Sequence, residues 1–121
     1  MKIRLHEIEY GSLDKEQSKN FYQAIFGFEP VIDQPNLAVF NLETSDIDLN
    51  VSEHIPANSI RVSYLTDDLN EVIERLTSNS IPFKGPEKWH LGMTSIEFSD
   101  PNGYIIRVNQ PGADSPEGLI I

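Results

Sequence analysis

Apolar residues recur at helical spacing in two segments of the chain, which predicts one helix over residues 14–26 and a second over residues 68–78. Each segment opens on an aspartate that is followed three residues later by Gln17 or Glu71, a capping-box-like start. Glu71 can also pair with Arg75 across one helical turn. The apolar stripes and the expected C-terminal stops are Phe21, Tyr22, Ile25, Phe26 and Gly27 in the first segment, and Leu69, Val72, Ile73, Leu76 and Asn79 in the second.

Short apolar or alternating runs surround both helices and predict four strands in each half of the chain. The order strand-helix-strand-strand-strand therefore occurs twice, at an offset of about 52 to 59 residues. Two such copies can form one curved mixed sheet with the helices outside and a concave, partly polar pocket within. The expected strands are residues 3–10, 28–32, 37–42 and 47–51 in the first half, and residues 60–65, 80–83, 90–98 and 104–108 in the second.

We predict an α+β protein made of two βαβββ modules, residues 1–57 and residues 58–111, which together are one domain. A tail rich in proline and glycine follows at residues 112–121 and ends in three apolar residues. The sequence leaves three alternatives open for this end: it docks on the body of the protein, it docks on a second subunit, or it is frayed.

Composition narrows the classes of partner. The formal net charge is −10 and the sequence pI is about 4.5, which disfavours binding to nucleic acid, because that binding needs clustered basic residues. The same charge attracts cationic small molecules, or it serves solubility alone. There is no cysteine, and no apolar run approaches the length of a membrane span. The N-terminus lacks the apolar core of a secretion signal, so we expect a cytoplasmic protein without membrane partners.

A hairpin near the C-terminus carries the most specific pattern. Asp100-Pro101-Asn102-Gly103 predicts a type I turn with positive φ at the glycine. In the strand that follows, alternate side chains point to opposite faces. Tyr104, Ile106 and Val108 lie on one face, and Ile105, Arg107 and Asn109 lie on the other.

This hairpin resembles the last hairpin of the vicinal oxygen chelate superfamily, which comprises glyoxalases, bleomycin-resistance proteins and extradiol dioxygenases. Residues 20–28, Asn-Phe-Tyr-Gln-Ala-Ile-Phe-Gly-Phe, are similar to the recurrent helix end of that family. With the duplication, the resemblance covers residues 3–111. It implies the paired βαβββ fold and dimerisation, which also covers open sheet edges. The activities of the family are many, so the fold alone does not select one.

The resemblance also implies four positions at which the family holds a divalent metal. Glu7 and Arg61 stand seven residues before the aspartate that opens each helix, and Asp48 and Arg107 stand in the last strand of each half. Asn50 shares a face with Asp48 and replaces it if the register slips by two residues.

Two of these four residues are arginines, whose guanidinium groups have no acceptor and a permanent positive charge. A divalent metal needs several lone-pair donors, so we expect no metal and no other cofactor. Arginine–carboxylate pairs are expected instead. This ion-pair cluster either satisfies polar side chains on a half-buried sheet or also holds a carboxylate or phosphate of a ligand.

No catalytic residue stands out. The histidines His6, His54 and His90 form no metal-binding spacing, and strand alternation places His6 on the face opposite Glu7. His90 and Glu7 are weak candidates for acid–base chemistry. Trp89 and Met93 either line an apolar pocket on the concave face or serve ordinary packing, and Asn109 lies on the same strand face as Arg107.

These residues favour a metal-independent small-molecule binder, similar to the bleomycin-resistance branch of the family, which is acidic and dimeric and takes cationic ligands. The alternative is an enzyme of the same superfamily, either a metal-dependent or a metal-free lyase, epimerase or dioxygenase. A metal-free enzyme would use Arg61 and Arg107 as electrophilic clamps. A third possibility is a structural domain whose pocket is filled by side chains.

Overall fold

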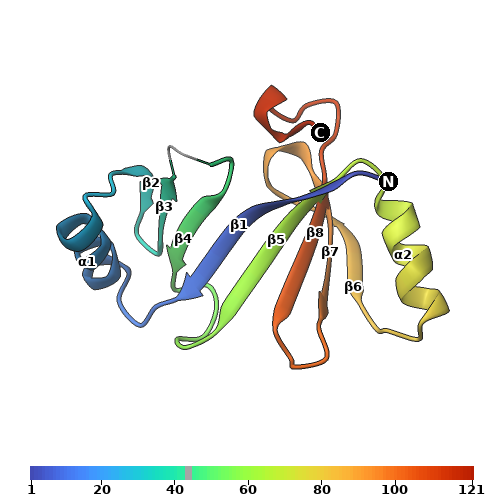
Figure 1. Cartoon of the computed structure of the whole chain (residues 1–121), viewed down its shortest axis with the longest axis horizontal. Helices are drawn as coiled ribbons and strands as arrows, with labels where there is room; N and C mark the ends of the chain where they lie inside the picture. Colours follow the sequence, from blue (N-terminus) through green and yellow to red (C-terminus); the bar gives the residue numbers. More distant parts are fainter. Residues whose placement is uncertain (43–44) are drawn as a thin grey trace. The chain divides into compact units, whose positions relative to one another are not determined.

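The computed structural model describes residues 1–42 and 45–121 (Figure 1). In these residues the expected α+β order, strand-helix-strand-strand-strand, occurs twice, which confirms the predicted fold class. The first copy consists of β1 (Ile3–Gly11), α1 (Lys15–Phe26), β2 (Pro30–Gln34), β3 (Leu37–Asn41) and β4 (Asp48–Ser52). The second consists of β5 (Ile60–Thr66), α2 (Leu69–Ser78), β6 (Lys84–Lys88), β7 (Thr94–Ser99) and β8 (Ile105–Gln110), with 3-10 turns at His90–Gly92 and Glu117–Leu119.

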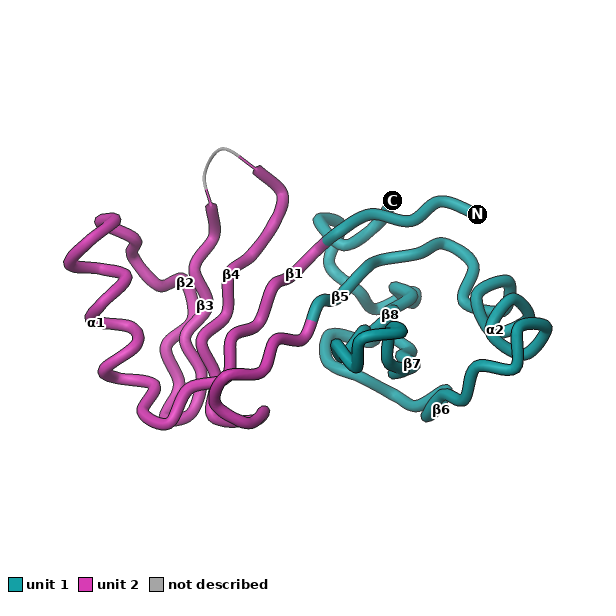
Figure 2. The backbone as a smooth tube through the Cα atoms, turned by 60° about the horizontal axis from the view of Figure 1, so that its bottom comes forward, with its two compact units in different colours: residues 1–5, 62–121 teal, residues 6–61 magenta. Residues whose placement is uncertain are grey.

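The chain forms two compact units (Figure 2). Unit 2 is His6–Arg61, and unit 1 is Met1–Leu5 together with Val62–Ile121. In unit 2 the strand order is β2-β3-β4-β1, with β1 parallel to β4 and the other pairs antiparallel. In unit 1 the order is β5-β8-β7-β6, and the β6–β7 and β7–β8 pairs are antiparallel. The module boundary at residues 57 and 58 and the concave pocket stay predictions.

Both helices begin at the predicted caps. The side chain of Asp14 accepts a hydrogen bond from Gln17 N at 3.2 Å, and that of Asp68 accepts one from Glu71 N at 3.1 Å. Gly27 ends α1 in the left-handed region, with φ 71°. The expected Glu71–Arg75 ion pair is also present, at 3.0 Å.

Each helix packs on one face of the strands of its own unit. In unit 1, Leu69, Val72 and Leu76 of α2 form a buried cluster with Ile96 and Val108. In unit 2 the buried cluster consists of Ala38, Phe40, Leu49 and Val51, against which Tyr22, Phe28 and Leu42 pack.

The predicted stripe of α1 is wrong for three of its four members. Tyr22 packs on the core of unit 2, but Phe21, Ile25 and Phe26 are exposed by 55%, 62% and 60%. Of the four, Tyr22 is the side chain that packs against the buried cluster of unit 2. The structure therefore leaves an apolar surface on α1.

Three predicted strands begin at least two residues later than expected. The strand expected at residues 28–32 is β2, which begins at Pro30. The strand expected at residues 80–83 is β6, which begins at Lys84, because residues 80 and 81 close α2. Ser80 has φ 57°, and Ile81 N donates to Leu76 O at 2.9 Å. The strand expected from His90 is β7, which begins at Thr94 after the 3-10 turn.

The C-terminal tail docks on unit 1, which settles one of the open alternatives. Leu119 is 8% exposed and clusters with Leu65 and Met93, and Trp89 and Ile121 pack against them. No helix in the described part of the chain is both long and apolar enough to cross a membrane.

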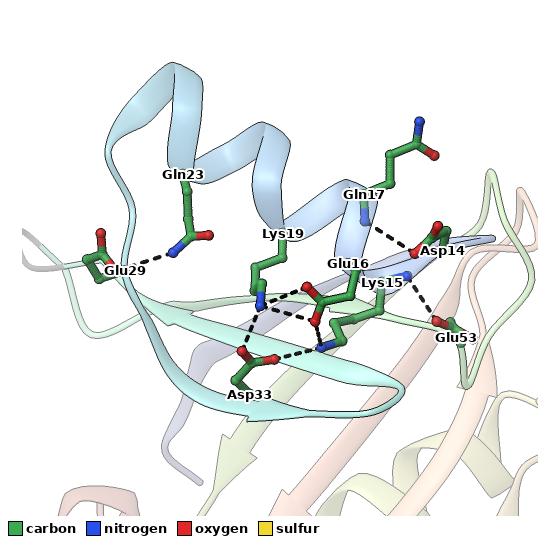
Figure 3. A network of polar contacts seen from close by, with 9 residues as sticks. All are labelled: Asp14, Lys15, Glu16, Gln17, Lys19, Gln23, Glu29, Asp33 and Glu53. Atoms are coloured by element: carbon green, nitrogen blue, oxygen red, sulfur yellow. Dashed lines mark hydrogen bonds and ion pairs between the residues drawn. The ribbon is translucent and has the colours of Figure 1, made fainter.

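A network of charges fastens α1 to β2 (Figure 3). The ammonium group of Lys15, whose side chain is 3% exposed, lies 2.6 Å from both Glu16 and Asp33. Lys19 reaches the same two carboxylates at 3.0 and 2.7 Å. Hydrogen bonds from Lys15 and Lys19 hold the pKa values of Asp33 and Glu16 below their usual range. Because Lys15 N also donates to Glu53 at 2.9 Å, the start of α1 is tied to two other segments of unit 2.

Phe40→Ala is expected to lower the free energy of unfolding by about 3–5 kcal/mol, because it empties a fully buried site. Leu13→Ala is the control, since Leu13 is 90% exposed and its loss should change stability by less than about 0.5 kcal/mol. Urea unfolding followed by circular dichroism measures both. Equal effects of the two substitutions would contradict the assignment of the core.

The charge network predicts a specific dependence of stability on pH. A carboxyl group with a lowered pKa stabilises the fold above its unfolded pKa of about 4, and this contribution is lost as the pH falls through the folded value. The advantage of the wild type over Asp33→Asn should therefore be largest near neutral pH and shrink between about pH 5 and pH 2. Urea midpoints at several pH values test this. Glu74→Gln, at an exposed position of α2, is the control that should show no such trend.

Candidate functional site

One face of the β1–β4 ladder of unit 2 is polar. Glu7 pairs with Asp48 and Glu9 pairs with Asn50 in the parallel register, so these four side chains share a face. Asn50 Nδ2 donates to Glu7 Oε2 at 2.8 Å. The opposite face carries Leu49 and its apolar neighbours beneath α1. The structure thus brings together three residues that the sequence singled out: Glu7, Asp48 and Asn50.

Arg61 binds a carboxylate that the sequence did not single out. Its Nη2 atom donates to Oε1 and Oε2 of Glu9 at 3.0 and 3.2 Å. The two side chains are largely buried, with exposures of 15% and 9%. The ion pair is therefore shielded from solvent, and it neutralises Glu9 rather than leaving Arg61 as an open anion clamp.

His6 lies beside the predicted carboxylates. Its Nδ1 atom is 3.7 Å from Glu7 Oε1, and its Nε2 atom is 4.0 Å from Asp48 Oδ2. The prediction that His6 points away from Glu7 is wrong for its ring. The ladder with β4 begins at the Glu7–Asp48 pair, so a ring that starts one residue earlier can reach both carboxylates at this end.

In unit 1 the corresponding polar group is Arg107, whose residue is 5% exposed. Its Nη1 atom donates to Ser95 Oγ at 2.8 Å and lies 3.4 Å from Glu87 Oε1. Its Nη2 atom donates to Glu97, its register partner across the β7–β8 ladder. The guanidinium also stacks on Trp89, with its central carbon 3.6 Å from the ring centroid. Carboxylates, a hydroxyl and an aromatic face thus surround this cation.

The other predicted site residues of unit 1 are Trp89, which contacts this cation, its neighbours His90 and Met93, and Asn109 on the same strand as Arg107. Trp89 packs with Met93 in the cluster that holds the tail, and the exposed ring of His90 lies 4.8 Å from the ring of Trp89. Asn109 is fully buried on the strand face of Arg107, opposite Ser95. In unit 2, His54 is exposed in its loop, as expected.

These residues do not fit the divalent metal that the fold family implies. Arg107 occupies one predicted position with a buried positive charge that is already bonded to two carboxylates. Arg61 occupies another and is bonded to Glu9. Across residues 1–42 and 45–121, no three histidine, aspartate or glutamate side chains are grouped as a metal site requires. A mechanism through such a metal therefore has no support in this donor set.

Sequence reasoning missed five polar neighbours of the predicted residues: His6, Glu9, Glu87, Ser95 and Glu97. Three of them could have been found from alternation. Glu9 lies two residues after Glu7 on the same strand face, and Ser95 and Glu97 stand opposite Asn109 and Arg107 in a hairpin whose turn was known. His6 breaks that alternation, and Glu87 depends on the later start of β6.

Comparisons with known proteins agree with this fold. A solved glyoxalase/bleomycin resistance protein/dioxygenase superfamily member from Vibrio splendidus 12B01 is similar with a TM-score of 0.68 and 20% identity, covering 90% of this chain and 99% of that one. The methylmalonyl-CoA epimerase of Mycobacterium tuberculosis is similar with a TM-score of 0.69 and 16% identity, covering 89% and 87%.

A relative by sequence is the Metallothiol transferase FosB of Lysinibacillus sphaericus (strain C3-41). It is 25% identical over 108 residues, which are 83% of this chain and 77% of that protein. The family description Glyoxalase/Bleomycin resistance protein/Dioxygenase superfamily matches residues 4–108, so most of the chain is covered. The protein therefore belongs to the glyoxalase/bleomycin resistance protein/dioxygenase superfamily.

Proposed function

We propose that the protein is a metal-independent small-molecule binder of its superfamily and that it favours cationic ligands. The observation that carries this proposal is that the two arginines at predicted ligand positions are both paired with carboxylates. Each is already bonded to carboxylates of its own unit, Arg61 to Glu9 and Arg107 to Glu87 and Glu97. Neither is an open site for a metal or for an anion.

The charge that surrounds these arginines supports a cationic ligand. In unit 2 three carboxylates, those of Glu7, Glu9 and Asp48, share one strand face, whereas Arg61 is the guanidinium bonded there. This strand face of unit 2 therefore carries a surplus of negative charge, which attracts cations from solution at low ionic strength.

We further propose that the binder is a cytoplasmic homodimer without nucleic-acid or membrane partners. The exposed apolar residues of unit 2 support self-association. Phe21 and Ile25 project from α1, and Val31, which is 63% exposed, lies on β2 at the end of the strand order of this unit. An apolar surface beside an unpaired edge strand is typical of an interface.

The alternative function is an enzyme of the same superfamily. It is supported by the relative that is named as a transferase. A metal-dependent reaction would need metal ligands at the four predicted positions, and arginines occupy two of them. A metal-free enzyme would rely on Glu7 or His90 as base. Assays of methylglyoxal–glutathione adducts and catechols with added Ni²⁺, Zn²⁺, Mn²⁺ or Fe²⁺ separate the two functions, since a binder turns over neither substrate.

Calorimetry with metal-free bleomycin tests the cationic ligand. Affinity is expected to fall by roughly a factor of ten or more, at least about 1.4 kcal/mol, between about 0.1 M and 1 M NaCl, because salt shortens the range of the attraction. Glu7→Gln should weaken binding at low salt, since it removes a charge and keeps an acceptor for Asn50. Glu29→Gln, at an exposed position of the same unit, should not. A flat salt dependence, or no binding, would refute the proposal.

Light scattering after gel filtration tests the dimer. The wild type should have twice the chain mass of 13.7 kDa, and the double substitution Phe21→Ser, Ile25→Ser should shift it to the monomer. Leu91→Ser is the matched control, because Leu91 is 60% exposed but lies in unit 1. A monomeric wild type would refute the dimer, and a dimer that survives the double substitution would show that α1 is not in its interface.

A further inference from the structure

The face of unit 1 that lies away from α2 is defined by strand alternation. Ile96 and Val108 pack with α2, so the neighbouring residues Ser95 and Asn109 project from the other face. Leu65 also projects there, because Tyr64 packs with the α2 cluster. We call this the distal face of unit 1.

The C-terminal tail covers part of the distal face. Leu119 is buried against Leu65 and Met93. The peptide just before it is fixed by a hydrogen bond from Arg4 Nη2 to Gly118 O at 2.9 Å. Nearer the start of the tail, Ser115 Oγ donates to Leu91 O at 2.7 Å. The tail is thus a strap with fixed points along its length and one deeply inserted side chain.

A polar side chain is buried on the face that this strap partly covers. Asn109 has 0% exposure, and neither Oδ1 nor Nδ2 has a hydrogen-bond partner among the described residues. The Nε atom of Arg107, two residues away on the same face, is also buried without a partner there. Buried side-chain amides in folded proteins are as a rule hydrogen-bonded, so an amide with both atoms unpaired indicates a group that a ligand completes.

We propose that Asn109 and Arg107 form a subsite for a carboxamide group of a ligand, and that residues 112–121 are a strap that moves aside to admit it. This inference rests on the proposed binding function and names one part of the ligand. A carboxamide offers an N–H donor for Asn109 Oδ1 and a carbonyl acceptor for Asn109 Nδ2 or Arg107 Nε. A carboxylate lacks the donor, and the carboxylates of Glu87 and Glu97 beside Arg107 repel it.

The surroundings suit the apolar body of such a ligand. Trp89 contacts both parts of the arrangement, since it packs against the Leu65–Met93–Leu119 cluster and carries the guanidinium of Arg107 on its ring at 3.6 Å. Movement of Leu119 therefore uncovers apolar surface that is continuous with the polar subsite.

The strap is tested first in the full-length chain by the fluorescence of Trp89, the only tryptophan. Leu119→Ser should shift the emission of Trp89 to longer wavelength and raise its quenching by acrylamide. Ile120→Ser is the matched control, because Ile120 is adjacent but 61% exposed, and it should leave both readings unchanged. Identical spectra for Leu119→Ser and the wild type would overturn the strap.

The subsite is tested by NMR titration with benzamide, with benzoate as the control probe. Benzamide should shift the side-chain amide signals of Asn109, and Leu119→Ser should bind it at least about tenfold more tightly than the wild type, since a larger fraction of molecules is open. Benzoate should cause no such shift. Asn109→Leu should abolish benzamide binding in both backgrounds while the melting temperature stays the same or rises, because the substitution buries no unpaired polar atom.

Equal binding of benzamide to Asn109→Leu and the wild type, or no binding to Leu119→Ser, would overturn the subsite. Bleomycin calorimetry separates this failure from failure of the proposed function. Salt-dependent bleomycin binding without benzamide binding leaves the binder and removes the subsite. Benzamide binding at Asn109 without bleomycin binding leaves the subsite and removes the cationic ligand.

Discussion

The compensation of a buried guanidinium is the constraint on which the polar part of this structure depends. Arg107 is 5% exposed, and a guanidinium group is a cation with five donors and no acceptor. Burial of an ion without partners is costly, so its neighbours must supply acceptors. Glu97 stands opposite Arg107 in the β7–β8 register. Ser95, two residues before Glu97 on β7, accepts a hydrogen bond from Arg107, and Glu87 of β6 accepts another. β6 and β7 therefore supply the acceptors for one cation on β8.

Much of the fold could be predicted from the sequence because the signals are local. Asp14 and Asp68 each cap the residue three positions later, and the turn at Asp100 is closed by a hydrogen bond from Gly103 N at 3.0 Å. These contacts span a few residues, so residue type and spacing are sufficient. The later start of β6 is different, because Ser80 takes a left-handed conformation that its residue type does not indicate.

The candidate site was predictable in its positions and not in its pairings. Glu7, Asp48 and Asn50 meet because the parallel β1–β4 register brings them to one face. The partner of Arg61 is Glu9, 52 residues earlier in the chain, and only the three-dimensional arrangement selects it over Glu7. Similarly, the exposure of Phe21 and Ile25 depends on how much of α1 the strands of unit 2 can cover. The helical spacing of apolar residues does not indicate how much of the helix surface the strands cover.

The surroundings of Arg107 also limit which side chains its position accepts. A single change of Arg107 to glutamate would set three acids side by side with Glu87 and Glu97. Mutual repulsion would then disfavour the folded state unless one of those two acids was also replaced. A reversal of charge at this position therefore requires at least two coordinated changes.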